Sequence, residues 1–166
     1  DKNKIDHNKI IDNALKIEKK QRNMISEGIT SASANDLIFF SDVDEIPNLE
    51  NFEYKNRITV FKQKMMYYKF NLMYPNFIWM GPKACKKKHF KSAEWLRNIK
   101  SKKYPWWRLD TLISEKKFTD ISFVENGGWH FTNVKSAKDI DFKMRNFAHH
   151  LEYEESGMNV NNLKDN

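Results

Sequence analysis

The chain has 166 residues and a formal net charge of +7 at pH 7, with 40% hydrophobic and 14% aromatic residues. This composition excludes an intrinsically disordered chain, and the length suits one domain with its own core. No run of about 18 apolar residues is present, so we expect no membrane-spanning segment. Because the chain begins with Asp1 rather than Met, we interpret it as a piece of a longer or processed protein.

Hydrophobic periodicity predicts helices that alternate with short buried strands. Ser92 is expected to cap one helix, and Ser136 with Asp139 matches the capping box of another. The expected helices cover 5–25, 93–100 and a segment from about 137, and the expected strands cover 37–41, 57–70, 75–82 and 121–126. This alternation favours an α/β domain with a largely parallel sheet over residues 1–156, followed by a polar tail at 157–166.

An acidic cluster, Asp42, Asp44 and Glu45, directly follows the apolar strand at 37–41. Alternate residues of an extended segment point the same way, so we expect Asp42 and Asp44 to face one point and Val43 to turn back into the core. Two carboxylates at one point favour a cation between them, and hard oxygen ligands suit Mg²⁺ or Mn²⁺. The alternative interpretation is a solvated acidic turn that caps the next helix.

A second informative segment is ENGGWHF at 125–131. Its two glycines allow a close backbone approach or a positive φ, Trp129 offers a flat apolar face for a sugar or base, and His130 is a common metal ligand. The alternative is a tight hairpin that contains a core tryptophan and a hydrogen-bonded core histidine.

Three motifs in this order, SDVDEIP (41–47), GGWHF (127–131) and KMRNFAHHLE (143–152), resemble glycosyltransferase family 17. This is the family of the N-acetylglucosaminyltransferases that add the bisecting GlcNAc in N-glycan processing. The resemblance extends over about residues 15–153 and includes the shorter matches QRN, GP and LR. It implies a GT-A fold, with a mostly parallel sheet flanked by helices, that lacks part of the N-terminal nucleotide-binding region.

The resemblance also implies an inverting transferase that moves GlcNAc from UDP-GlcNAc to a glycan or glycoprotein acceptor. Asp42 and Asp44 match the motif that holds Mn²⁺ or Mg²⁺ against the UDP diphosphate, and His130 is our candidate to complete the metal shell. The implied nucleotide- and substrate-binding residues are Asp42, Glu45, Arg97, Trp129, Arg145 and His149.

An inverting transfer needs a carboxylate that takes the proton of the acceptor hydroxyl. We predict Glu125, which lies at a strand end before the glycine pair, and then Asp110, which lies beside an aromatic cluster. A solvent-facing strand end is the alternative interpretation of Glu125.

Two further groups of residues are candidates for the acceptor site. Tyr104, Trp106 and Trp107 offer stacking surfaces for sugar, and we expect one ring of the tryptophan pair to be buried and the other available. Arg145, His149 and Glu152 share one helical face, as a wall of the active site or as an ion-pair ladder.

Two other function classes remain open, a Mg²⁺-dependent phosphoryl-transfer or hydrolase domain and a basic nucleic-acid-binding module. The sharpest cluster is acidic, so we expect no nucleic-acid partner. The single cysteine, Cys85, is interpreted as a structural thiol. The compartment follows the source: cytoplasmic for a bacterial or viral protein, and the Golgi lumen if an anchor lies upstream.

Overall fold

The computed structural model describes residues 2–50 and 52–146. The chain divides into two compact units, residues 22–132 and a second unit built from residues 1–21 and 133–166. The larger unit contains the whole sheet and most of the residues singled out from the sequence.

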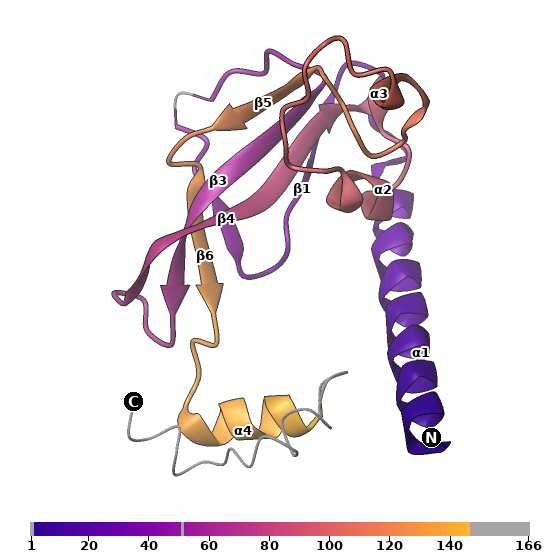
Figure 1. Cartoon of the computed structure of the whole chain (residues 1–166). Helices are drawn as coiled ribbons and strands as arrows, with labels where there is room; N and C mark the ends of the chain where they lie inside the picture. Colours follow the sequence, from indigo (N-terminus) through magenta and orange to yellow (C-terminus); the bar gives the residue numbers. More distant parts are fainter. Residues whose placement is uncertain (1, 51, 147–166) are drawn as a thin grey trace. The chain divides into compact units, whose positions relative to one another are not determined.

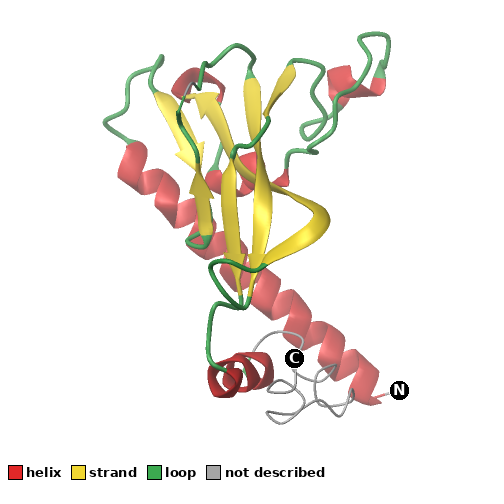
Figure 2. Cartoon of the chain, turned by 90° about the vertical axis from the view of Figure 1, so that its left-hand side faces the viewer, coloured by secondary structure: helices red, strands yellow, loops and turns green. Residues whose placement is uncertain are grey.

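The larger unit is built on a curled six-stranded sheet with the order β1-β4-β3-β6-β2, in which β5 also pairs with β3 (Figures 1 and 2). The strands are β1 (Leu37–Phe40), β2 (Glu45–Pro47), β3 (Ile58–Tyr67), β4 (Met73–Lys86), β5 (Ile121–Val124) and β6 (Gly128–Thr132). The α/β class predicted from the sequence is therefore confirmed.

The expectation of a largely parallel sheet is wrong, because the sheet is mixed. The β1–β4, β3–β4 and β2–β6 pairings are antiparallel, and only β5 and β6 run parallel to β3. The connection from β3 to β4 shows the reason. It is a tight turn in which the Tyr67 N–H donates to the Leu72 carbonyl at 2.9 Å, whereas a parallel neighbour needs a crossover of a dozen or more residues.

Strands β5 and β6 follow one another along the same edge of β3 (Figure 1). Phe61 pairs with Val124 and Lys64 pairs with Trp129, so residues 62–63 of β3 face residues 125–128. The Gly127 N–H donates to the Lys62 carbonyl at 2.7 Å inside this irregular stretch. The segment 121–132 is thus one interrupted strand rather than a hairpin.

Helix α2 (Ala93–Asn98) packs against β1 and β4 and closes the core. Ser92 caps it as predicted, because the Ser92 side chain accepts a hydrogen bond from the Trp95 N–H. A second short helix, α3 (Asp110–Ile113), lies in the following loop. The buried apolar cluster consists of Phe40, Ile58, Val60, Cys85, Ala93, Trp95, Leu96, Ile99 and Ile121.

The smaller unit contains most of α1 (Lys2–Ile25) and all of α4 (Ala137–Arg145). The predicted helix start is confirmed: the Ser136 side chain caps α4 by accepting from the Asp139 N–H at 3.2 Å, and its hydroxyl donates to the Asp139 carboxylate at 2.6 Å. The polar tail predicted at 157–166 lies outside the described residues. Among the residues that the structure describes, no helix combines the length and apolarity needed to cross a bilayer.

Candidate functional site

The two most informative sequence segments meet as neighbouring strands. SDVDEIP ends in β2 and GGWHF forms β6, and the antiparallel register pairs Glu45 with His130, Ile46 with Trp129 and Pro47 with Gly128. Residues directly opposite each other share a face of a sheet, so Glu45 and His130 lie on one face and Trp129 lies on the other. The pairing therefore places an acidic residue and an imidazole side by side.

The expected extended geometry of the acidic cluster is wrong. Residues 42–45 form a turn in which the Glu45 N–H donates to the Asp42 carbonyl at 3.0 Å, and strand β2 begins only at Glu45. Val43 is 99% exposed rather than turned into the core. In a turn the alternation of side chains along a strand does not apply, so Asp42 and Asp44 face different partners.

Glu45 is the buried centre of this region, with only 1% of its side chain exposed. Its carboxylate accepts hydrogen bonds from the Trp79 indole at 2.6 Å and from the Asp42 N–H at 3.1 Å, and it lies 3.5 Å from the Arg97 guanidinium. These donors offset the cost of burying a carboxylate. Glu45 therefore connects the turn before β2, strand β4 and helix α2.

Arg97 reaches this region from α2. It forms an ion pair with Asp42 at 2.8 Å, and its guanidinium carbon lies 5.9 Å from the centre of the Trp79 ring. Lys83 fixes the end of α2, because its ammonium donates to the carbonyls of Arg97 and Ile99 at 2.6 Å and 2.5 Å. Burial, assisted by the nearby Arg97 charge, lowers the pKa of Lys83 to about 8.

His130 stacks on Trp79, with ring centres 4.4 Å apart and planes 17° apart. Its Nδ1 atom is buried and has no hydrogen-bond partner among the described residues. A carboxylate oxygen of the half-exposed Asp44 lies 3.9 Å from Nδ1. We call Asp42, Asp44, Glu45, Trp79, Arg97 and His130 the Glu45 cluster.

The Glu45 cluster contains a donor pair that fits a cation. A carboxylate oxygen is the ligand type that Mn²⁺ and Mg²⁺ prefer, and a buried imidazole nitrogen without a partner is a common metal ligand beside it. Asp42 is held by Arg97 instead, and the described part of the chain has no group of three or more His, Cys, Asp or Glu side chains placed to share an ion. Of the three predicted metal ligands, the structure thus brings together Asp44 and His130.

Gly127 and Gly128 are explained by packing against the backbone. A Cβ atom on Gly128 would lie 2.0 Å from the Ile46 carbonyl oxygen, and its φ is +120°. A Cβ atom on Gly127 would lie 2.9 Å from the Phe61 Cβ atom. The glycines therefore let β6 fit between β2 and β3. The alternative of a hairpin with a core tryptophan is wrong, since β6 pairs with β2 and β3 and Trp129 is 41% exposed.

The two predicted bases lie in ion pairs outside the Glu45 cluster. Glu125 is exposed and pairs with Lys62 at 2.6 Å, and Lys62 leaves β3 on the face opposite to its neighbour Gln63. Asp110 accepts two hydrogen bonds from Arg108 and one from Lys117, each at 2.7 Å. Hydrogen bonds from Arg108 and then from Lys117 hold the pKa of Asp110 far below its ordinary value, which makes this carboxylate a weak base.

The tryptophan pair differs from expectation. Both rings are exposed, Trp106 at 84% and Trp107 at 64%, and it is Tyr104 that is buried. The pair lies in a turn, closed by a hydrogen bond from the Arg108 N–H to the Pro105 carbonyl at 3.1 Å, and the two ring centres lie 5.9 Å apart. The rule that neighbours point to opposite faces holds only in strands.

Arg145 is the last residue of α4 in the smaller unit, where it pairs with Asp141 at 2.9 Å. For Arg145 this contact matches the expected ion-pair ladder rather than a wall of the active site. The predicted His149 and Glu152 lie outside the described residues.

Sequence reasoning missed two residues on the Glu45 face, Trp79 and Gln63. They are directly paired on β4 and β3, and Gln63 is completely buried. Neither amide atom of Gln63 has a hydrogen-bond partner in the described part of the chain. No local pattern singled out Gln63, because Thr59 and Lys62 are also polar residues of β3. Together with His130 Nδ1, its amide marks a face with unused polar groups.

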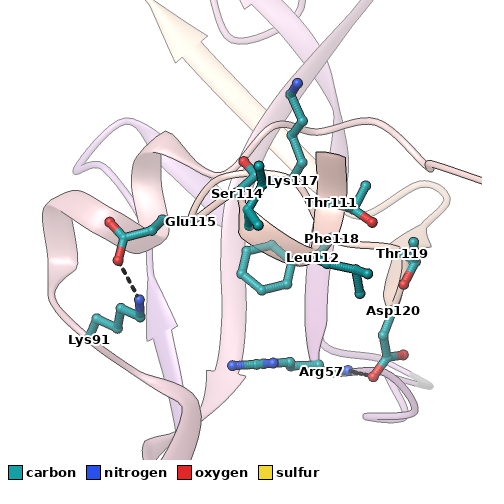
Figure 3. A pocket seen from close by; sticks show the side chains of 11 residues that line it. Arg57, Lys91, Thr111, Leu112, Ser114, Glu115, Lys117, Phe118, Thr119 and Asp120 are labelled. Carbon is teal, nitrogen blue, oxygen red and sulfur yellow. Dashed lines mark hydrogen bonds and ion pairs between the residues drawn. The ribbon is translucent and has the colours of Figure 1, made fainter. Parts of the chain in front are cut away.

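A pocket of about 430 Å³ lies between α3 and the loop that follows it (Figure 3). Arg57, Lys91, Lys117 and Phe118 contribute to its lining, and Lys91 is paired with Glu115 at 2.8 Å. Among the described residues, its lining includes no member of the Glu45 cluster and no predicted site residue.

Comparison with protein-family models, curated proteins and solved structures finds no match for this chain. The family resemblance therefore depends on the sequence motifs alone.

Proposed function

We propose that this chain is part of an inverting, metal-dependent glycosyltransferase of the GT-A type, which moves GlcNAc from UDP-GlcNAc to a glycan acceptor. The observation that carries the proposal is the pairing of β2 with β6, which joins the SDVDEIP and GGWHF segments and sets Asp44 beside His130. Both segments belong to the motif set that resembles glycosyltransferase family 17.

Asp44 and His130 would hold the Mn²⁺ or Mg²⁺ ion. When bound, such an ion offsets the negative charge that develops on a diphosphate leaving group. Two protein ligands suit these cations, because they usually keep several waters and take further oxygen ligands from substrate phosphates. The half-exposed Asp44 gives the pair an open side.

The remaining residues of the Glu45 cluster position this pair. Glu45 fixes the Trp79 indole, and Trp79 in turn stacks on the His130 ring and limits its rotation. Arg97 holds Asp42 and thereby the turn that carries Asp44. Positioning of this kind lowers the cost of arranging ligands when the nucleotide binds.

We assign the acceptor base to neither Glu125 nor Asp110. Each is ion-paired with cations that do not belong to the Glu45 cluster, and the lowered pKa of Asp110 reduces its basicity further. The proposal therefore concerns donor binding, which can be tested without knowing the base or the acceptor.

The test is isothermal titration of the chain with UDP-GlcNAc and with UDP, in the presence and absence of Mn²⁺. We expect binding that requires Mn²⁺, and we expect Asp44→Asn to weaken it at least about tenfold because one ligand is lost. Glu53→Gln is the matched control, since Glu53 is an exposed acid that pairs with the equally exposed Lys55 at 2.7 Å.

Equal binding of UDP by the wild type and by Asp44→Asn would contradict the proposal, as would the absence of any Mn²⁺-dependent binding. Release of inorganic phosphate from UDP without sugar transfer would instead favour the hydrolase alternative.

A further inference from the structure

Residues 100–116 form a closed loop whose two ends are tied together. The Lys100 N–H donates to the Lys116 carbonyl at 2.8 Å, and the Trp95 indole donates to the neighbouring Glu115 carbonyl at 2.8 Å. Tyr104 is buried and fixes the loop from within. We call this segment, which includes α3 (Figure 1), the 100–116 loop.

The middle of the 100–116 loop presents large apolar side chains to solvent. Their exposed fractions lie between 64% and 88% for Trp106, Trp107, Leu109, Leu112 and Ile113. The ring centres of Trp106 and Trp107 lie 5.9 Å apart. Five large exposed apolar side chains within eight consecutive residues concentrate apolar surface in one loop, and such a concentration favours an interaction site.

Positive charge surrounds this apolar tip. The loop contains five basic residues and two acidic ones. Asp110 is paired with Arg108 and Lys117, and Glu115 is paired with Lys91. The exposed lysines 100, 102, 103 and 116 lie towards the tied ends of the loop, so cations border the apolar residues on both sides.

We propose that the 100–116 loop docks onto the surface of an anionic lipid bilayer. Tryptophan side chains favour the boundary between headgroups and acyl chains, and leucine and isoleucine gain by leaving water. Lysines close to the surface are attracted by acidic headgroups, each strengthening binding several-fold. The apolar side chains of the loop therefore suit the boundary with the acyl chains, and the lysines beside them suit the acidic headgroups.

Charge complementarity selects a bilayer over a protein partner. The apolar centre of a protein interface is depleted of lysine, whereas membrane-surface segments combine lysine or arginine with tryptophan and leucine over a short length. Docking of this kind leaves the loop on the surface and needs no spanning helix. The inference is independent of the proposed transferase activity.

The test is co-sedimentation of the whole chain with phosphatidylcholine vesicles that contain or lack phosphatidylserine. We expect binding to the vesicles that contain phosphatidylserine and much weaker binding to those that lack it. The double variant Lys102→Gln/Lys103→Gln is expected to weaken binding about thirtyfold, and Trp106→Ser/Trp107→Ser at least about tenfold.

Phe70→Ser is the matched control, because Phe70 is also an exposed ring, at 71%, on a different loop. It should bind vesicles as the wild type does. Unaltered thermal unfolding of the loop variants verifies that these exposed substitutions leave the fold intact.

Equal binding by the wild type and both loop variants, or no binding to phosphatidylserine vesicles, would overturn the proposal. Vesicle-free self-association that disappears in the tryptophan variant, without vesicle binding, would assign the patch to a second copy of the chain instead.

Discussion

At the scale of single residues, the buried charges explain how the Glu45 cluster is held. Glu45 is surrounded by donors from three segments, the turn before β2, strand β4 and helix α2. Lys83 lies beneath the same helix end and holds the carbonyls of Arg97 and Ile99. Glu45 thus holds the turn before β2 and the Trp79 indole, and Lys83 holds the end of α2.

We predict that Lys83 makes the free energy of unfolding depend on pH. Its pKa is lowered from 10.5 to about 8 in the folded chain, so between these values the unfolded chain binds more protons and stability rises with pH. The free energy of unfolding of the wild type, relative to Lys83→Met, should increase by about 3 kcal/mol from below pH 8 to above pH 10.5. Urea unfolding of both proteins across this range measures the difference.

The Cys85 thiol does not disturb this comparison. Burial raises its pKa to about 12, which lowers stability at alkaline pH in the wild type and in Lys83→Met alike. A difference that stays constant with pH would show that Lys83 titrates normally in the folded chain.

At the scale of elements, the site depends on the narrow fit of β6 between β2 and β3. Gly128 adopts a φ of +120° with its α-carbon against the Ile46 carbonyl, and Gly127 lies against Phe61. The four-residue stretch 125–128 faces two residues of β3 and so shifts the register between β5 and β6, and in β6 His130 lies opposite Glu45 of β2. The motif glycines thus act on the site through strand register.

We expect Gly128→Ala to lower the free energy of unfolding by more than about 3 kcal/mol, because the new Cβ atom meets backbone 2.0 Å away and the φ value strains any L-residue. Gly28→Ala is the control, since a Cβ atom there has nothing within 4 Å, and its effect should stay within about 1 kcal/mol. Chemical denaturation of both variants tests this. Similar stabilities of the two would refute the packing explanation of the glycine pair.

At the scale of the whole molecule, β4 lies between β1 and β3 in the sheet of the larger unit. The reactivity of Cys85 on this strand shows whether the sheet opens. The thiol is completely buried, between β1 on one side and β3 on the other, and burial raises its pKa to about 12. A buried neutral thiol is unreactive until the surrounding sheet opens.

Alkylation of Cys85 by iodoacetamide should therefore be at least about a hundredfold slower in native buffer than in denaturant. Glu53→Cys in a Cys85→Ala background supplies an exposed thiol. In native buffer and in denaturant alike, it should be alkylated as fast as Cys85 is in denaturant. Rapid labelling of native Cys85, followed by mass spectrometry, would show that the β1–β4 edge opens readily.

The sequence by itself determined the local elements. The caps at Ser92 and Ser136, the apolar strand before the acidic cluster and the β-prone segment at 57–70 all appear near their predicted places. These features depend on residues within a few positions of one another, so their physical causes can be read from a short window.

Only the tertiary structure decided which strands pair, in which direction, and which acid is buried. Glu45 was predicted to bind substrate beside the two aspartates, and its burial follows from Trp79 and Arg97, which come from distant parts of the chain. The turn at 42–45 separates Asp42 from Asp44, and the pairing of β2 with β6 brings His130 to Asp44. Strand pairing is stabilised by contacts between remote segments, and no local pattern encodes their partners.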